Sequence, residues 1–434
     1  MRTLFGFLFA VACFAQKAYL VPAPPSGLTP ARNLSHAGMQ GNFEALWSVI
    51  DTTYADFKLK SIDWKAVGRR YRERLASVKT DDEFYTLLFQ LVNELKDTLS
   101  WLQNQRPPFT QGVPDLAIDL FNGKPFLVAV RPGSAAAAAG LAPGWEVLAV
   151  DGLSYEEKLE ALRPYLHACS SERAYRLQAA RGLLSGQNDS LATLKLRSPD
   201  GRVQTLALQR RPGPSTHPPE RKPDFELTRQ RFVHYGRHPS GLGYIWIESF
   251  SAHQEVADEF DLALEALRDT PALILDIRDN SGGFGQTHIV GRLLTRRVLA
   301  AVSHVKSGPR HNDLKKQEVY ISPAGDWQYT RSVALLVNGG TGSASDLFAC
   351  ELRSAHRVLT IGSTTHGNLS GVGAYAVLPC GLVVRVSNGY VCDAKDRPVE
   401  INGNVPDVAV EGGIADFLNH RDPVLEKAVE LLRK

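Results

Sequence analysis

Short, almost entirely apolar runs alternate with helical patterns between residues 244 and 361, and this alternation constrains the fold more than any other feature of the chain. The apolar runs occupy residues 244–247, 272–277, 333–337 and 358–361, and helical patterns occupy 255–267 and 286–294. Continuous apolar runs of this length are typical of strands buried on both faces of a sheet. Strands that alternate with helices form mostly parallel sheets covered by helices. We therefore predict an α/β unit in this half of the chain.

Two regions with other periodicities precede this unit. From about residue 42 to residue 102 apolar side chains recur at helical spacing, so residues 19–106 are predicted to form a domain built as a small helical bundle. Residues 107–212 instead carry short strand patterns and turn signals, which predict a β-rich domain. Clustered prolines mark residues 213–226 as a stiff linker, which leaves residues 227–434 for the α/β domain. The sequence thus predicts a multidomain α/β protein.

The first residues have the pattern of a secretory signal peptide. A positive end, Met1-Arg2-Thr3, precedes an apolar run at residues 4–12 and small residues around Cys13. We assign residues 1–18 as the signal peptide and expect a periplasmic or secreted protein. Lipidation of Cys13 is an alternative, although Ala10-Val11-Ala12 is a poor lipidation motif. No later stretch has the length of a transmembrane helix.

Charge and cysteine content exclude several classes of function. The 434 residues carry a net charge of +3, and the basic residues are scattered, so no nucleic-acid partner is indicated. No CxxC spacing suggests a zinc site, and we expect no metal and no cofactor. Cys380 and Cys392 either form a disulfide or remain free buried thiols.

Two glycine-rich turns carry the candidate chemistry. Residues 333–349, VALLVNGGTGSASDLFA, run from a strand into a helix with Ser343 at the junction. Backbone N–H groups are unpaired at a helix start, so a nucleophilic hydroxyl and donors to an oxyanion can meet there. The alternative is a serine that only caps the helix. The second turn, Asn280-Ser281-Gly282-Gly283, follows another strand and exposes N–H groups suited to an anion.

These turns, taken with GSTTHGNLSG at residues 362–371, resemble the S41 serine peptidases, which include the C-terminal processing (tail-specific) proteases and the tricorn core proteases. The resemblance extends over nearly the whole chain after the signal peptide. It implies a ClpP/crotonase-like catalytic domain and a peptide or unfolded protein as substrate. By position, Ser343 is the nucleophile, and the N–H groups of Ala344 and of Gly282 or Gly283 form the oxyanion hole.

A second resemblance concerns residues 133–152, which are similar to the PDZ signature of small residues followed by GL.PG and VDG. It implies a groove at Gly140 and Leu141 that binds an extended peptide as an added strand, with backbone N–H groups holding its C-terminal carboxylate. The alternative is a PDZ-shaped spacer with a closed groove.

The residues that activate the serine depart from the family pattern. Asn368 stands where one branch has a lysine base, and Leu99 stands where the other branch has a histidine base. Glu400 matches the glutamate of the histidine branch. Without a base the hydroxyl is a poor nucleophile, and a rate loss on the order of 10⁴ is usual. His366 is the best substitute, with Glu400 orienting its imidazole.

Three interpretations follow. The first is an exported serine endopeptidase of the S41 type. The second is a catalytically impaired relative that binds peptides or other ligands, which Leu99 favours. In the third, a scaffold protein, the PDZ-like groove is the functional site.

Overall fold

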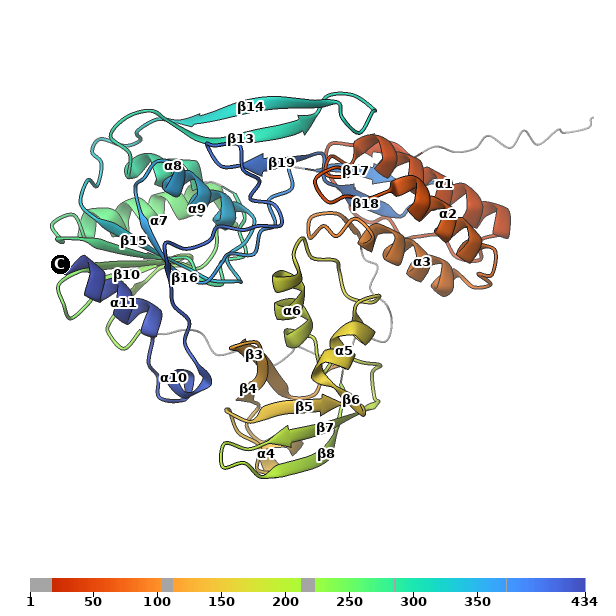
Figure 1. Cartoon of the computed structure of the whole chain (residues 1–434), viewed down its shortest axis with the longest axis horizontal. Helices are drawn as coiled ribbons and strands as arrows, with labels where there is room; N and C mark the ends of the chain where they lie inside the picture. The colour runs from red at the N-terminus through yellow and green to blue at the C-terminus, as the bar shows by residue number, and fades with distance from the viewer. Residues whose placement is uncertain (1–17, 104–111, 212–222, 285, 372, 434) are drawn as a thin grey trace, which may run out of the picture.

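The computed structural model describes residues 18–103, 112–211, 223–284, 286–371 and 373–433, which form three parts (Figure 1). One part is an α/β unit, the second contains the N-terminal helices, and the third is rich in β-strands. The predicted signal peptide falls outside these residues, apart from residue 18. Much of the predicted linker does as well.

A seven-stranded sheet forms the centre of the α/β unit. Its strand order is β20-β16-β15-β12-β11-β10-β9. The five strands from β11 to β20 are parallel to one another, whereas β10 pairs antiparallel with β11 and β9 pairs antiparallel with β10. The predicted mostly parallel sheet is therefore confirmed. The strands are β9 (Thr228–Arg229), β10 (Val233–Arg237), β11 (Gly243–Ile247), β12 (Leu273–Asp276), β15 (Val333–Val337), β16 (Leu359–Gly362) and β20 (Val408–Ala409).

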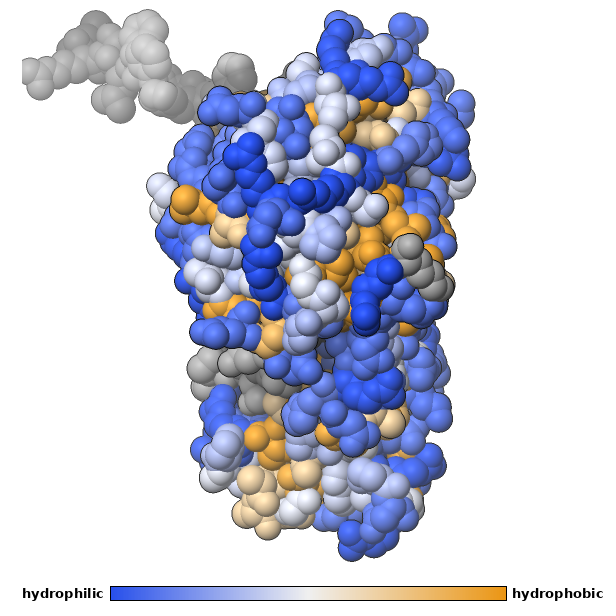
Figure 2. Space-filling model, turned by 90° about the vertical axis from the view of Figure 1, so that its left-hand side faces the viewer, coloured by the Kyte–Doolittle hydropathy of each residue, from blue (hydrophilic) through white to orange (hydrophobic). Residues whose placement is uncertain are grey.

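Helices cover both faces of this sheet. Successive side chains of a strand point to opposite faces, so Leu273 and Leu275 of β12 pack in one core and Ile274 packs in the other. The first core also receives the buried faces of α7 (His253–Ala266), α8 (Gln286–Arg292) and α9 (Ala344–Ser354). Helix α11 (Pro423–Leu432) closes the second core. Seen from the left-hand side of Figure 1, the molecular surface is mainly hydrophilic with separate apolar areas (Figure 2).

A three-stranded antiparallel sheet lies beside the α/β unit and was not predicted. Strand β13 (Val298–Lys306) pairs with β14 (Leu314–Ile321) on one edge and with β19 (Gly389–Cys392) on the other. β14 forms the outer edge of the molecule in Figure 1.

The N-terminal helices pack on a sheet that the C-terminal half of the chain completes. The helices are α1 (His36–Thr53), α2 (Trp64–Leu75) and α3 (Asp81–Asn93), the last with a capping box formed by Thr80 and Glu83. Their sheet has the order β1-β17-β18-β2. Its outer strands, β1 (Tyr19–Val21) and β2 (Trp101–Leu102), flank β17 (Ala374–Val377) and β18 (Val383–Val386). Residues 374–386 thus pack with the helical part, although the sequence assigned them to the α/β domain.

The β-rich part is an antiparallel sheet with three helices. Its strands are β3 (Leu116–Phe121), β4 (Lys124–Val130), β5 (Glu146–Val150), β6 (Leu153–Ser154), β7 (Leu191–Arg197) and β8 (Val203–Gln209). The helices are α4 (Ala135–Ala138), α5 (Tyr155–Leu162) and α6 (Glu172–Arg181). The small helix α10 (Ile414–Leu418) approaches this part through a ring contact between Phe417 and Phe121 at 5.5 Å.

The structure also bears on the state of the cysteines and on the presence of membrane-spanning helices. The four described cysteines, including Cys380 and Cys392, are free and buried, so the disulfide alternative is wrong. None of the described helices combines the length and the apolarity that crossing a membrane requires.

Candidate active site

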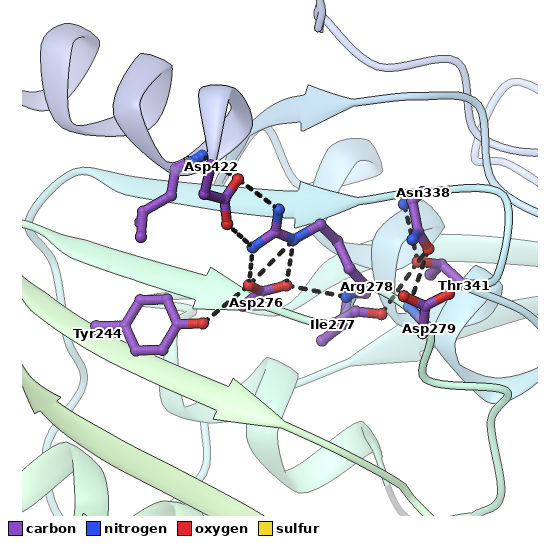
Figure 3. Close-up of polar contacts among 9 residues, drawn as sticks. Tyr244, Asp276, Ile277, Arg278, Asp279, Asn338, Thr341 and Asp422 are labelled. Atoms are coloured by element: carbon purple, nitrogen blue, oxygen red, sulfur yellow. Dashed lines mark hydrogen bonds and ion pairs between the residues drawn. The ribbon is translucent and has the colours of Figure 1, made fainter. Parts of the chain in front are cut away.

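Two turns meet where the neighbouring strands β12 and β15 end, and they build the candidate site. The strands are parallel, so their C-terminal ends lie at the same edge of the sheet. The hydroxyl of Thr341 donates to the carbonyl of Ile277 over 3.0 Å (Figure 3). The side-chain oxygen of Asn338 accepts a hydrogen bond from the N–H of Asp279 at 2.9 Å. These bonds fix one turn against the other.

A buried ion network supports the first turn. Arg278 is 5% exposed, and its guanidinium lies between the carboxylates of Asp276 and Asp422 (Figure 3). It donates two parallel hydrogen bonds to Asp422, over 2.8 and 2.7 Å. The Tyr244 hydroxyl donates to Asp276 over 2.9 Å. Because Asp422 also caps α11, the network ties this helix to the turn.

Ser343 has a strained backbone at the start of α9. Its φ of 55° and ψ of −121° lie in a region that residues other than glycine rarely adopt. Its side chain makes no capping hydrogen bond, and its hydroxyl has no hydrogen-bond partner among the described residues. The alternative of a serine that only caps the helix is therefore wrong. The strained turn presents a free, partly exposed hydroxyl.

Backbone N–H donors lie beside this serine. A Cβ atom added to Gly282 would be 2.6 Å from Cβ of Ser343 and 2.8 Å from the backbone nitrogen of Ala344. The N–H of Gly282 donates to Oδ1 of Asn280 over 2.9 Å. By contrast, the N–H groups of Gly283 and Ala344 have no hydrogen-bond partner in the described part of the chain. Of the two glycines proposed for an oxyanion hole, Gly283 is the one with a free donor.

Asn368 holds the serine through its backbone. Its Oδ1 accepts the N–H of Ser343 at 2.5 Å. The loop of Asn368 is in turn fixed by the buried carboxylate of Asp346, which accepts the N–H of Gly367 at 3.0 Å, the N–H of Asn368 at 3.2 Å and the Thr365 hydroxyl. Burial raises the pKa of Asp346 to about 6. Asn368, which stands where one branch of the family has a lysine base, thus serves here to position Ser343.

His366 lies next to the serine turn and is more enclosed than an exposed loop histidine would be. Its N–H donates to the Thr341 carbonyl over 2.8 Å, and its carbonyl accepts the Ser171 hydroxyl at 3.1 Å. Burial, followed by the charges of Arg173 and Arg181, lowers the pKa of His366 to about 4. The imidazole is therefore neutral at pH 7, and its buried Nδ1 has no partner among the described residues. This pKa lies well below the usual histidine value of about 6.5.

Glu400 does not contact His366 and instead pairs with Lys60. Oε1 of Glu400 lies 2.6 Å from Nζ of Lys60, with side-chain exposures of 0% and 2%. Lys60 also donates to the carbonyl of Lys96 over 2.8 Å. The expected role of Glu400 in orienting His366 is therefore wrong. Sequence reasoning missed Lys60, which lies between α1 and α2 and carries no local motif.

The position of the missing histidine adjoins this ion pair. The N–H of Leu99 donates to Oδ1 of Asp97 over 2.9 Å, and the Ser370 hydroxyl donates to the same oxygen over 3.0 Å. Burial opposes ionisation of Asp97, but the charge of Lys60 and hydrogen bonds from Leu99, Ser387 and Ser100 lower its pKa overall. Burial raises the pKa of Asp56, a third carboxyl beside Lys60, well above its usual value. No described side chain at this position replaces the histidine base.

Helix α6 of the β-rich part lies against the serine loop. Arg173 donates to the carbonyl of Thr365 over 3.1 Å and to that of His366 over 3.2 Å. Arg181 bridges Asp119 of β3 and Asp279 of the first turn, each over 3.2 Å. The β-rich part is therefore joined to the candidate site through α6.

Gly140 and Leu141 are not placed as the predicted peptide-binding donors. The N–H of Gly140 donates to Ala137 over 3.0 Å, and that of Leu141 donates to Ala136 over 3.1 Å. The side chain of Leu141 is 5% exposed and belongs to the core of the β-rich part. Since neither N–H is free, capture of a carboxylate by these two residues is contradicted.

Known proteins resemble this chain over most of its length. Residues 241–410 match the model of peptidase family S41, and residues 35–93 match the tricorn protease C1 domain. The chain is 26% identical over 369 residues to the chloroplastic carboxyl-terminal-processing peptidase 2 of Arabidopsis thaliana, covering 80% of this chain and 62% of that protein. It is 22% identical over 414 residues to the carboxyl-terminal-processing protease of a Synechocystis species, covering 89% of this chain and 85% of that protein.

A solved structure shares the fold. Mature CPAF, complexed with lactacystin, matches with a TM-score of 0.76 at 15% identity, covering 92% of this chain and 98% of that one. The chain spans less than two thirds of the length of the Arabidopsis relative. The Arabidopsis and Synechocystis relatives are both peptidases by name, so they give no support to the alternative of a non-catalytic binding protein.

Proposed function

Because the chain belongs to peptidase family S41, we propose that it hydrolyses peptide bonds with Ser343 as the nucleophile. The observation that carries this proposal is the free hydroxyl of Ser343 on a strained turn, next to the unpaired N–H of Ala344 and to Gly282, whose neighbour Gly283 also has an unpaired N–H. In the proposed reaction the hydroxyl attacks the peptide carbonyl, and these two donors stabilise the negative charge on its oxygen. The substrate is a peptide or an unfolded protein tail.

We assign the role of general base to His366. Its imidazole is neutral at physiological pH, as a proton acceptor must be. A base with a pKa of about 4 accepts a proton weakly, so turnover should be slow compared with an enzyme whose base titrates near 7. Glu400 keeps an electrostatic role through its pairing with Lys60.

The remaining assignments complete the proposal. Residues 1–18 direct export to the periplasm or out of the cell, residues 19–106 form the helical domain and residues 107–212 form a PDZ-like domain. Residues 213–226 link these to the S41 domain at 227–434. The contacts of α6 with Thr365 and Asp279 support a role for the PDZ-like domain at the entrance to the site.

Labelling with a fluorophosphonate probe tests the role of Ser343. The full chain should gain one probe, mapped by mass spectrometry to the peptide containing Ser343, and Ser343→Ala should abolish it. Ser345→Ala is the matched control, because Ser345 lies on the same helix, is 0% exposed, and its hydroxyl has no hydrogen-bond partner in the described structure. An unlabelled wild type, or equal labelling of Ser343→Ala, would refute the proposal.

His366→Ala tests the role of the general base independently of the role of the nucleophile Ser343. It should lower peptide hydrolysis by roughly 10²-fold or more while leaving the protein folded. Hydrolysis at the wild-type rate in this variant would remove His366 from the mechanism and leave Ser343 untouched.

A further inference from the structure

Three side chains with metal-binding atoms converge on the three-stranded sheet, away from Ser343. They are His304, Cys392 and Asp396, and one ligand atom from each lies within 4.8 Å of the other two. The sequence indicated no metal site because His304 lies far along the chain from Cys392 and Asp396, and no CxxC spacing marks them.

Strand pairing explains why the three residues meet. His304 of β13 lies directly opposite Tyr390 of β19, and Val302 lies opposite Cys392. Residues opposite each other in an antiparallel pair share a face, as do residues two apart on one strand. His304 and Cys392 are therefore diagonal neighbours on one face of the sheet. The imidazole also stacks on the ring of Tyr390, with centroids 4.9 Å apart, which fixes its plane.

A tight turn brings Asp396 over this face. The chain reverses after Cys392, which forms a β-bridge with Pro398. Within the turn, the N–H of Asp396 donates to the carbonyl of Asp393 over 2.9 Å, and the Asp393 carboxylate accepts the N–H groups of Lys395 and Arg397 at 2.9 and 3.0 Å. Oδ1 of Asp396 reaches Nε2 of His304 at 2.7 Å. The carboxylate is thus held in place by a rigid turn.

We propose that His304, Cys392 and Asp396 bind a divalent cation of the zinc class. Zn²⁺ accepts sulfur, imidazole nitrogen and carboxylate oxygen, whereas Mg²⁺ and Ca²⁺ avoid thiolates. Ligand atoms around tetrahedral zinc are about 3.5 Å apart, so shifts of about 1 Å would convert the present cluster into a site with one position left for water. The side chains of His304 and Asp396 are 18% and 37% exposed, which gives the ion access from solvent.

Lys316 is the neighbour that opposes the cation. It lies opposite His304 on β14, and its Nζ is 2.7 Å from Oδ2 of Asp396. Its side chain is 51% exposed and can leave the carboxylate without being buried elsewhere. Lys316→Gln should therefore tighten zinc binding, by roughly threefold to tenfold, because it removes one nearby positive charge.

The bound ion would link the 392–398 turn to β13 through its three ligands. This turn leads directly into the segment that carries Glu400. The N–H of Val399, the residue before Glu400, donates to the carbonyl of Val391 in β19 over 3.1 Å. Zinc should consequently raise the melting temperature of the full chain, independently of any peptidase activity.

Titration of the full chain with Co²⁺, a spectroscopic substitute for Zn²⁺, tests the site. One equivalent should produce a thiolate-to-cobalt charge-transfer band that Zn²⁺ abolishes. Cys392→Ser should eliminate the band, and Asp396→Asn, a change at the exposed turn that should not affect folding, should weaken Zn²⁺ binding at least about 100-fold, since losing even an outer partner of a ligand costs 10–100-fold.

Cys380→Ser is the matched control, because Cys380 is also a buried free thiol but packs in the helical part. It should keep the band. Absence of a charge-transfer band in wild type, an equal band in Cys392→Ser, or unchanged zinc affinity in folded Asp396→Asn would overturn the proposal.

Discussion

Replacing Lys60 by methionine should destabilise the protein more than replacing Glu400 by glutamine, although the two residues form one ion pair. Their charged atoms are 2.6 Å apart, with side-chain exposures of 2% and 0%. Two further carboxyl groups, those of Asp56 and Asp97, are 0% and 1% exposed nearby. Lys60 supplies the main opposing charge for all three acidic groups. This buried cluster therefore holds three carboxyl groups around one lysine, and the two members of the Lys60–Glu400 ion pair are not equivalent.

The asymmetry sets the expected magnitudes. Lys60→Met leaves three buried carboxyl groups without their cation, and breaking a buried pair in this way costs about 3–5 kcal/mol of unfolding free energy. Glu400→Gln removes one excess negative charge and leaves Lys60 paired with Asp97 and Asp56. Its cost should be about 1–2 kcal/mol, the scale of one lost hydrogen-bond partner.

Urea unfolding at pH 7, followed by circular dichroism and tryptophan fluorescence, measures both variants. Lys58→Met is the control, because Lys58 is exposed and should change the unfolding free energy by less than about 0.5 kcal/mol. Burial raises the pKa values of Asp56 and Glu400, so the folded Lys60→Met variant should bind more protons than the unfolded chain and regain stability between pH 7 and pH 5. A cost for Glu400→Gln equal to or above that of Lys60→Met would refute the reasoning.

Three further predictions concern the serine site. Leu99→His restores the family's base position and should raise kcat/KM for a peptide substrate by roughly 10²–10⁴-fold; an unchanged value in a folded variant would argue against a missing base. Gly282→Ala places a methyl group 2.6 Å from Cβ of Ser343 at a φ of 107°, so it should cost about 2–4 kcal/mol and suppress fluorophosphonate labelling, and wild-type labelling would contradict this geometry. His366 has a pKa lowered from 6.5 to about 4, so between these pH values the unfolded chain binds more protons than the folded protein. The free energy of unfolding should therefore fall by about 3 kcal/mol as the pH drops from 6.5 to 4. His366→Gln should abolish that part of the pH dependence in urea unfolding, and an identical pH dependence would show that the imidazole is solvated.

The meeting of the two turns could be predicted from sequence because it follows from local patterns. Apolar runs identify the strands that end at Asp276 and Val337, and their parallel pairing places Gly282 next to Ser343. The chemistry around the serine was harder to predict. The pairing of Lys60 with Glu400 joins residues far apart in the chain, and neither residue belongs to a periodic pattern that would indicate its partner.

Several strands were also missed, for different reasons. Strand β14 contains Lys315-Lys316-Gln317-Glu318, and such a polar edge strand has no apolar face for a pattern search to detect. Strands β17 and β18 have apolar sequences, but their partners are helices from the opposite end of the chain. Periodicity indicates that a strand is buried without saying which part of the protein buries it.

The shared sheet of the helical part has a consequence for synthesis. Leu102 packs in the same core as Ala376 and Val384, so the ribosome must add roughly 270 residues after the last N-terminal strand before that core can close. At translation rates of about 5–20 residues per second, this takes on the order of tens of seconds. During that time the apolar faces of α1, α2 and α3 have emerged without their sheet. These helices therefore wait longest for their packing partners and are the part of the nascent chain with the greatest need for a holding chaperone.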